Sequence, residues 1–198
     1  MPVPADNPFS ITALNRAAAP EALDMMDRII ERSDWLAARA VTARPFADAA
    51  ALAAWLEQQV TGLPRQDAIL LLQAHPELAP AAPAEMTAAS QSEQGRMRLL
   101  DPAPALADAL ADLNAEYRDK HGFPFVIALH AQPDMEAVLA QFRGRLAAPT
   151  AEELPRSLRE VVSVMKARLA RLTGDTSVMQ GRAEAAGVPA TLTGDTRP

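Results

Sequence analysis

Three side chains that are far apart in the sequence carry groups able to move a proton or hold an anion: His75, Glu93 and Arg168. His75 follows a strongly apolar segment and precedes Pro76, so its imidazole, which titrates near neutral pH, would stand on a rigid support. The same histidine is also explained as a cap at the C-terminal end of a helix, where its cationic form interacts favourably with the helix dipole.

Arg168 lies at the edge of the apolar stripe of a long predicted helix. On a helical wheel it falls beside Val161 and Leu172. A guanidinium in this position needs a partner, because an unpaired buried charge is costly. Its side chain either snorkels or forms an internal salt bridge, or it offers a planar fork to a ligand carboxylate or carbonyl.

The segment Ser90–Gln94 combines several polar groups. Ser90 and Glu93 have the spacing of a capping box, which predicts a helix that begins at Ser90 and runs to about Leu100. The free N–H groups at such a helix start also bind anions. A hydrolase with Ser90 as nucleophile and His75 as base is less favoured, since capping explains the serine and no acidic third member is placed by spacing.

The other two histidines, His121 and His130, are expected to be partly exposed loop residues. A zinc site would need further ligands at defined spacing, and none is apparent. The chain has no cysteine, which excludes thiolate nucleophiles, disulfides and cysteine-containing metal sites. No metal is therefore expected.

The elements that must position these groups are predicted to be helices. The 198 residues include 43 alanines and 23 leucines but only 15 valines and isoleucines, which favours an all-α fold. Apolar periodicity predicts helices over residues 103–120 and 135–146 and from Leu154 to Leu172. Thr150 and Glu153 suggest a capping box before the last of these, but Pro155 predicts that the regular helix begins only at Leu154 or Pro155.

Further helices are predicted upstream, and two segments depart from the helical pattern. Pro20 opens one helix, Ser33 is a plausible N-cap of the next, and a segment from Pro64 to Ala74 contains Ile69–Leu72, which is expected to be buried on most sides. Residues 122–129 are apolar and aromatic but interrupted by proline, which predicts a buried short strand or extended loop. A single compact domain over residues 1–172 and a flexible extension over residues 173–198 are expected.

The charge balance bears on partners and location. The formal net charge of −6 argues against general binding to nucleic acid or to anionic membranes, because both need surplus positive charge. No apolar stretch approaches the ~20 residues of a membrane span, and the amino terminus lacks a secretory signal pattern. A cytoplasmic protein is expected.

Taken together, these residues lie in motifs that resemble one family. The motifs are His75-Pro76-Glu77-Leu78, Ser90-x-x-Glu93-Gln94, Leu113-Asn114-x-x-Tyr117, Gly122-Phe123-Pro124-Phe125-Val126-Ile127 and Arg168-Leu169. Their order and their residues resemble those of the 2-oxo-4-hydroxy-4-carboxy-5-ureidoimidazoline (OHCU) decarboxylases. The resemblance covers roughly Phe9 to Leu172. The sequence departs from this pattern at His121, where the family commonly has phenylalanine, at Ala148, where asparagine is often found, and at Arg98, where glycine is frequent.

The resemblance implies an all-helical, cofactor-free and usually dimeric enzyme that acts on a small molecule and forms (S)-allantoin. It implies that His75 is the acid/base residue, with Glu93 and Arg168 as catalytic partners. Expected substrate contacts are Pro76, Ser90, Gln91, Ser92, Gln94, Phe125, Val126, Ile127, Ala128 and Leu129. In the mechanism that follows, Glu93 orients His75 for proton delivery, and Arg168 with backbone N–H groups stabilises the anion left by CO2. The alternatives are a binding or scaffold protein of the same fold without turnover, or a relative with a different ureido or imidazoline substrate.

Overall fold

A computed structural model describes residues 9–179, and this part of the chain is helical without any strand, as predicted. The α-helices in this range are α1 (Ile11–Arg16), α2 (Ala19–Asp27), α3 (Asp34–Thr42), α4 (Ala49–Thr61), α5 (Arg65–Gln73), α6 (Ala88–Arg96), α7 (Pro104–His121), α8 (Met135–Ala147) and α9 (Thr150–Thr173). Short 3-10 helices occur at η1 (Pro83–Glu85), η2 (Leu129–Ala131) and η3 (Thr176–Met179).

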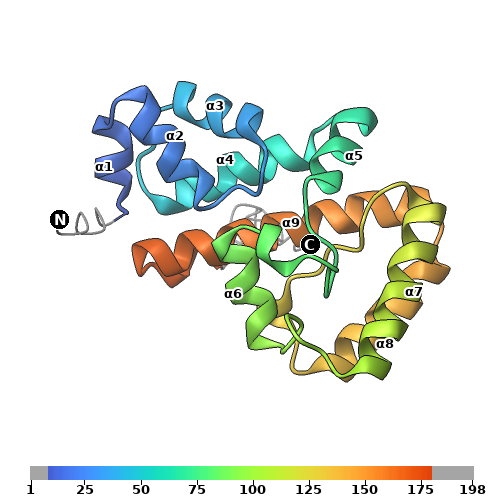
Figure 1. The fold of residues 1–198 in the computed structure, drawn as a ribbon. Coiled ribbons are helices and arrows are strands. Elements are labelled where there is room, and N and C mark those ends of the chain that lie inside the picture. The colour runs from blue at the N-terminus through green and yellow to red at the C-terminus, as the bar shows by residue number, and fades with distance from the viewer. Residues whose placement is uncertain (1–8, 180–198) are drawn as a thin grey trace, which may run out of the picture.

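The longest of these helices, α9, forms the axis of the molecule. It packs against α4, α5 and α7. Figure 1 shows α1 to α4 gathered over one end of α9 and α7 with α8 at the other, while α5 and α6 lie between them. Helices distant in sequence are thereby brought to the middle of α9.

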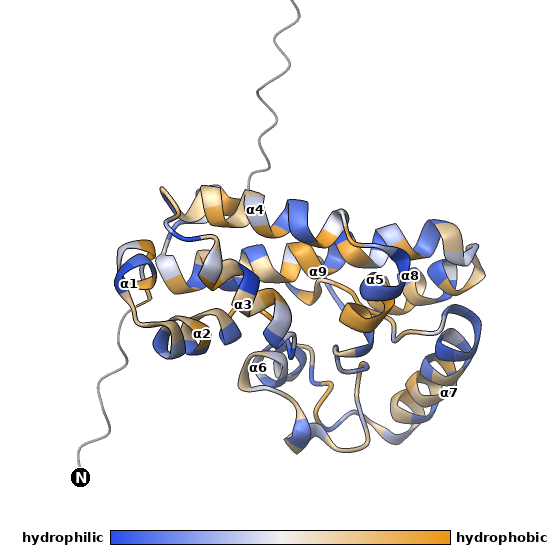
Figure 2. Cartoon of the chain, turned by 90° about the horizontal axis from the view of Figure 1, so that it is seen from above, coloured by the Kyte–Doolittle hydropathy of each residue, from blue (hydrophilic) through white to orange (hydrophobic). Residues whose placement is uncertain are grey.

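The apolar stripe of α9 explains this central position. Leu158, Val161, Val162, Met165 and Leu169 are all buried. Their spacing places them on one face, which several other helices cover. Most helices carry both hydrophobic and hydrophilic residues in Figure 2, as amphipathic helices do.

The predicted start of α9 was wrong. The helix begins at Thr150 and contains Pro155, and the Thr150–Glu153 capping box does not form. A proline disturbs only the carbonyl four residues earlier, which belongs here to Ala151. Because Ala151 is exposed in the first turn, water can hydrate that carbonyl.

The segment after α7 is an extended loop rather than a strand. Gly122 ends α7 with a φ of 81°, a left-handed conformation that glycine adopts without a steric penalty. Every residue from Phe123 to Leu129 is buried. Phe125 stacks on Phe142 with 3.9 Å between ring centroids.

The apolar run on α5 is less buried than predicted. Leu71 and Leu72 have no exposed surface, but Leu70 is 56% exposed. The helix turns about 100° per residue, so consecutive leucines cannot all face one core. α5 is therefore covered on one side only.

The chain beyond α9 packs back onto the core at first. Gly174 ends α9, η3 contacts α4 and α9, and Val178 is 2% exposed. The predicted extension over residues 173–198 thus starts with a packed turn, and residues 180–198 lie outside the described residues. None of the described helices combines the length and apolarity that a membrane crossing requires.

Candidate active site

His75 lies just beyond the end of α5, and its ring is held by the last turn of that helix. Its Nδ1 is 2.9 Å from the carbonyl oxygen of Leu71. Because a carbonyl can only accept, this hydrogen bond places a proton on Nδ1. In the neutral ring, Nε2 then keeps a free lone pair that can accept a proton.

The chain that follows His75 is fixed by two other helices. The Gln94 amide on α6 donates from Nε2 to the Glu77 carbonyl at 2.7 Å and accepts from the Ala79 N–H at 2.9 Å. Asn114 on α7 donates to the Leu78 carbonyl at 2.9 Å. These bonds tether the backbone after His75 to α6 and α7, so the imidazole has little freedom to move.

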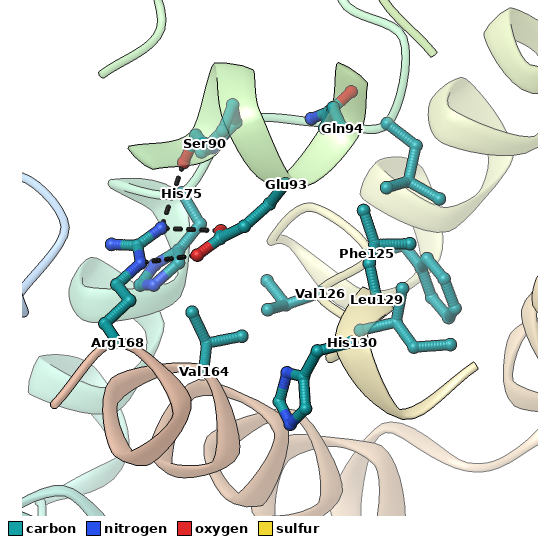
Figure 3. A pocket seen from close by; sticks show the side chains of 13 residues that line it. His75, Ser90, Glu93, Gln94, Phe125, Val126, Leu129, His130, Val164 and Arg168 are labelled. Atoms are coloured by element: carbon teal, nitrogen blue, oxygen red, sulfur yellow. Dashed lines mark hydrogen bonds and ion pairs between the residues drawn. The ribbon is translucent and has the colours of Figure 1, made fainter. Parts of the chain in front are cut away.

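Arg168 on α9 lies between two carboxylates. Its Nε and Nη2 each lie 2.8 Å from a different oxygen of Glu93, a bidentate pair, and its Nη1 is 2.9 Å from Glu31. Nη2 also donates to the Ser90 hydroxyl at 3.2 Å. Figure 3 shows Arg168 joined to Glu93 and Ser90, with His75 beside them. Of the five N–H groups of a guanidinium, four thus have protein partners.

Glu31 is a member of this cluster that the sequence analysis missed. It lies in the loop after α2, is 1% exposed and also accepts hydrogen bonds from Thr87 and Ser90 at 2.9 Å. The available signal was its position directly after Ile29 and Ile30, both of which are buried. A carboxylate that follows a buried apolar pair must have a partner, but the sequence does not name it.

The predicted capping box at Ser90 was wrong. Thr87 is the N-cap of α6, and its hydroxyl accepts from the Ser90 N–H at 3.3 Å. The helix ends at Arg96, not near Leu100. Ser90 therefore lies inside the helix, where its hydroxyl donates to Glu31 rather than to His75. This arrangement does not activate Ser90 as a nucleophile.

The predicted link between Glu93 and His75 is also absent. Both oxygens of Glu93 bind Arg168, and the hydrogen bond that orients His75 comes from Leu71. Glu93 acts on His75 through its charge instead. In formal charges, two carboxylates and one guanidinium give the cluster one excess negative charge next to the imidazole.

These surroundings set the protonation states. Burial lowers the pKa of His75, and Arg168 adds to this, while the Leu71 hydrogen bond, Glu31 and Glu93 oppose it. The resting ring is therefore neutral at pH 7. Burial alone would lower the pKa of Arg168, but Glu93 and Glu31 outweigh it and raise that pKa, so the guanidinium stays charged.

A hollow of about 50 Å³ adjoins this cluster and is mostly apolar. Many of the expected site residues lie on its wall: His75, Pro76, Ser90, Glu93, Gln94, Phe125, Val126, Ile127, Leu129 and Arg168. Leu78, His130 and Val164 also line it and were not predicted. The distant segments named by the sequence motifs thus meet around one cavity.

Three expected contacts do not line this hollow. Gln91 donates its side-chain amide to the Met86 carbonyl, Ser92 lies on a neighbouring hollow, and the Ala128 N–H donates to Glu160. By contrast, the backbone N–H groups of Phe125, Val126 and Ile127 donate to no acceptor among the described residues. These donors are therefore available to a ligand. The described residues contain no cluster of His, Asp and Glu side chains suited to a metal ion.

The positions that depart from the family pattern have local explanations. Arg98 has a φ of 57°, and the Leu99 N–H donates to the Gln94 carbonyl at 3.0 Å, as in a Schellman motif. Glycine is the residue best suited to this conformation. Ala148 is the C-cap of α8.

The remaining departure, His121, was expected to be an exposed loop residue, and this was wrong. It is the last residue of α7 and is 3% exposed. Its ring lies 4.4 Å from that of Tyr117 and stacks on Phe123. An aromatic ring therefore occupies the place where the family commonly has phenylalanine. His130 lies on η2 and is half-buried.

Fold and site together define an all-helical protein with an imidazole, two carboxylates and a guanidinium beside one small cavity. Residues 15–170 match the family described as OHCU decarboxylase. The chain belongs to this OHCU decarboxylase family.

Individual relatives extend the comparison. Two proteins named 2-oxo-4-hydroxy-4-carboxy-5-ureidoimidazoline decarboxylase are similar over most of their length. One, from Bos taurus, is 34% identical over 84% of this chain and 99% of its own. The other, from Haloferax volcanii, is 31% identical over 82% of this chain and 95% of its own.

Solved structures show the same fold. A crystal structure of OHCU decarboxylase in the presence of (S)-allantoin matches with a TM-score of 0.62 at 20% identity, over 77% of this chain and 99% of that one. A crystal structure of (S)-allantoin synthase matches with a TM-score of 0.61 at 23% identity and covers 83% of this chain. This chain spans only 54% of that structure's chain.

Proposed function

We propose that this chain decarboxylates 2-oxo-4-hydroxy-4-carboxy-5-ureidoimidazoline to (S)-allantoin without a cofactor. The observation that carries the proposal is the placement of His75, whose Nδ1 is bound to the Leu71 carbonyl and whose Nε2 has no partner among the described residues, beside the Glu31–Arg168–Glu93 cluster. Relatives that share the family carry this activity in their names.

The substrate can accept its own electrons. When the bond to the carboxylate breaks, CO2 leaves and the electron pair forms a double bond to the neighbouring imine carbon. The imine pair moves onto the ring nitrogen, which takes a proton from solvent. The intermediate is an enol, and the hydroxyl group stays on the carbon that held the carboxylate.

His75 then completes the reaction as base and acid in turn. Its Nε2 takes the proton of the enol hydroxyl, a carbonyl forms, and the imidazolium returns the proton to the former imine carbon. The excess negative charge of the cluster stabilises the transient imidazolium. Delivery from one fixed side gives one enantiomer. Positioned acid/base groups typically contribute about 10²–10⁴-fold.

Arg168 has a different role here from the one first expected. Because four of its N–H groups bind Glu93, Glu31 and Ser90, it holds Glu93 in place rather than binding the substrate anion. We assign stabilisation of developing charge instead to the backbone N–H groups of Phe125, Val126 and Ile127, residues that line the cavity and whose N–H groups have no acceptor among the described residues.

The test uses substrate freshly made from urate by urate oxidase and hydroxyisourate hydrolase. Circular dichroism should show (S)-allantoin forming faster than the spontaneous decay, and dialysis against a chelator should leave the rate unchanged. Racemic product at the spontaneous rate would reject the activity and favour a binding protein of this fold. Single-enantiomer turnover of another ureido compound alone would indicate a different substrate.

A homodimer and a cytoplasmic location belong to the same proposal. Their support is the family resemblance for the dimer and the sequence pattern for the location. Sedimentation equilibrium of the purified chain should give twice the mass of one 21.1 kDa chain. A monomer at micromolar concentration would contradict the dimer.

A further inference from the structure

A second hollow of about 220 Å³ lies against the site on its other side. Glu93, His130 and Arg168 line both hollows and therefore form the wall between them. The outer part of the second hollow is lined by Arg96 on α6 and Arg171 on α9.

These two arginines have charges that no described residue neutralises. Both are exposed, and neither makes a hydrogen bond or ion pair with any residue in the described range 9–179. The carboxylate that lines this hollow, Glu93, is already paired with Arg168. Two unneutralised positive charges thus face one hollow in a chain whose formal net charge is −6.

We infer that this hollow is a docking site for the carboxylate of a small anionic ligand. The identity of that ligand rests on the proposed function. Guanidinium groups bind carboxylates well, often through two parallel hydrogen bonds. A carboxylate held there is stabilised in its ionised form and resists decarboxylation. The reaction itself is assigned to the apolar hollow next to His75, on the other side of the wall that Glu93 and Arg168 form.

The test compares an inert anion with a neutral ligand of similar shape. Hydantoin-5-acetate carries a carboxylate on a related ring, and (S)-allantoin has none. Binding of both is measured by calorimetry for the wild type, for Arg96→Glu/Arg171→Glu, and for the control Arg156→Glu/Arg159→Glu. The control arginines are exposed residues near the other end of α9.

Reversing the charges at positions 96 and 171 should weaken the binding of hydantoin-5-acetate about tenfold. The binding of (S)-allantoin should change by less than about twofold. The control should leave both unchanged within about twofold. Equal changes for the two ligands, or the same loss in the control, would overturn the docking site.

Two further outcomes keep the inferences separate. In the wild type, raising the salt concentration from about 0.02 to 0.2 M should weaken the binding of the anion but not that of (S)-allantoin, because salt screens exposed charges. Salt-independent anion binding would overturn the docking site even if the double variant failed to fold. A chain that discriminates the ligands but has no turnover would reject the proposed reaction alone, and an active chain without discrimination would reject the docking site alone.

Discussion

Two buried arginines, Arg168 on α9 and Arg145 on α8, have similar partners but different surroundings. Arg168 binds Glu93, Glu31 and Ser90. Arg145, on α8, donates from Nε to Glu153 at 2.7 Å and from Nη2 to Ser157 at 3.0 Å. Each cluster therefore consists of a guanidinium, at least one carboxylate and a serine hydroxyl.

The two clusters differ in how accessible they are to solvent. Glu153 and Ser157 have no exposed surface, and Tyr117 closes the cluster by donating to Glu153 at 2.5 Å. In the other cluster, the Glu93 side chain is 24% exposed and lies on the wall of a cavity that His75 shares. A buried ion pair alone thus does not identify an active site. The feature that distinguishes the candidate site is a cluster that opens onto a cavity next to a titratable ring.

The sealed cluster still serves the site indirectly. The guanidinium carbon of Arg145 lies 4.5 Å from the ring centroid of Phe125. Phe125 belongs to the extended loop after α7, several residues of which line the cavity. Arg145 therefore packs against this loop, and we expect the loss of Arg145 to affect stability more than catalysis.

The largest expected effect is a loss of stability when the cluster around Arg145 is broken. Arg145→Met removes the charge that compensates Glu153 in a fully buried place, so the free energy of unfolding should fall by about 3–5 kcal/mol. Urea denaturation followed by circular dichroism measures this loss. A loss below about 1 kcal/mol would show that Glu153 is neutral or hydrated, contrary to a sealed cluster.

The second prediction separates the clusters by activity. Glu93→Gln removes the excess negative charge that favours the imidazolium of His75, so kcat should fall about 100-fold. The free energy of unfolding should change by only about 1 kcal/mol, because Glu93 is partly exposed and Arg168 keeps Glu31. Glu57→Gln, which breaks an exposed pair with Lys166, is the matched control. Equal kcat in the two variants would remove Glu93 from the mechanism.

A third prediction concerns pH. Burial lowers the pKa of His121 below its usual value of 6.5. The unfolded chain therefore binds a proton at this residue at pH values where the folded chain does not. Stability from this residue is present above about pH 6.5 and is lost as the pH falls toward the folded pKa. His75 and His130, with lowered pKa values, add in the same direction.

His121→Phe isolates one of these contributions. Its Nε2 is buried and has no partner among the described residues, whereas Nδ1 pairs with the Thr150 hydroxyl at 3.0 Å. Phenylalanine should keep the ring packing and lose both nitrogens, so the free energy of unfolding should rise by about 1 kcal/mol at pH 5. Thermal unfolding at pH 5 and pH 8 measures the difference. A gain that is equal at both pH values would show packing rather than proton binding as its cause.

The smallest expected effect lies after α6. Arg98→Gly should raise the free energy of unfolding by about 0.5 kcal/mol, because relief of the left-handed backbone is partly offset by the greater freedom of glycine in the unfolded chain. Activity should be unchanged, since Arg98 is exposed and does not line the cavity. A decrease in stability would show that the arginine side chain makes a compensating contact.

The comparison also shows what the sequence could predict. Apolar periodicity located α7, α8 and α9, and the glycine and proline in residues 122–129 marked the buried loop. Both signals are local, because they depend on which face of a segment avoids water. The same argument placed Arg168 at the edge of an apolar face and required a partner for it.

The partners themselves depend on tertiary contacts. Glu31 and Arg168 are separated by 137 residues, and no local pattern relates them. The wrong prediction of Ser90 as the N-cap of α6 has a similar cause, because Ser90 donates to Glu31 from another element and Thr87 is the cap. Family resemblance named His75, Glu93 and Arg168 together, but not the hydrogen bonds that give each its role.

The central claim is that His75 carries the proton at the open cluster, and one variant tests it most directly. His75→Ala should lower the rate of allantoin formation from fresh substrate by about 10²–10⁴-fold, with the far-ultraviolet circular dichroism unchanged. The allantoin that still forms should be racemic, because no fixed group delivers the proton. Wild-type rate and a single enantiomer from this variant would contradict the account.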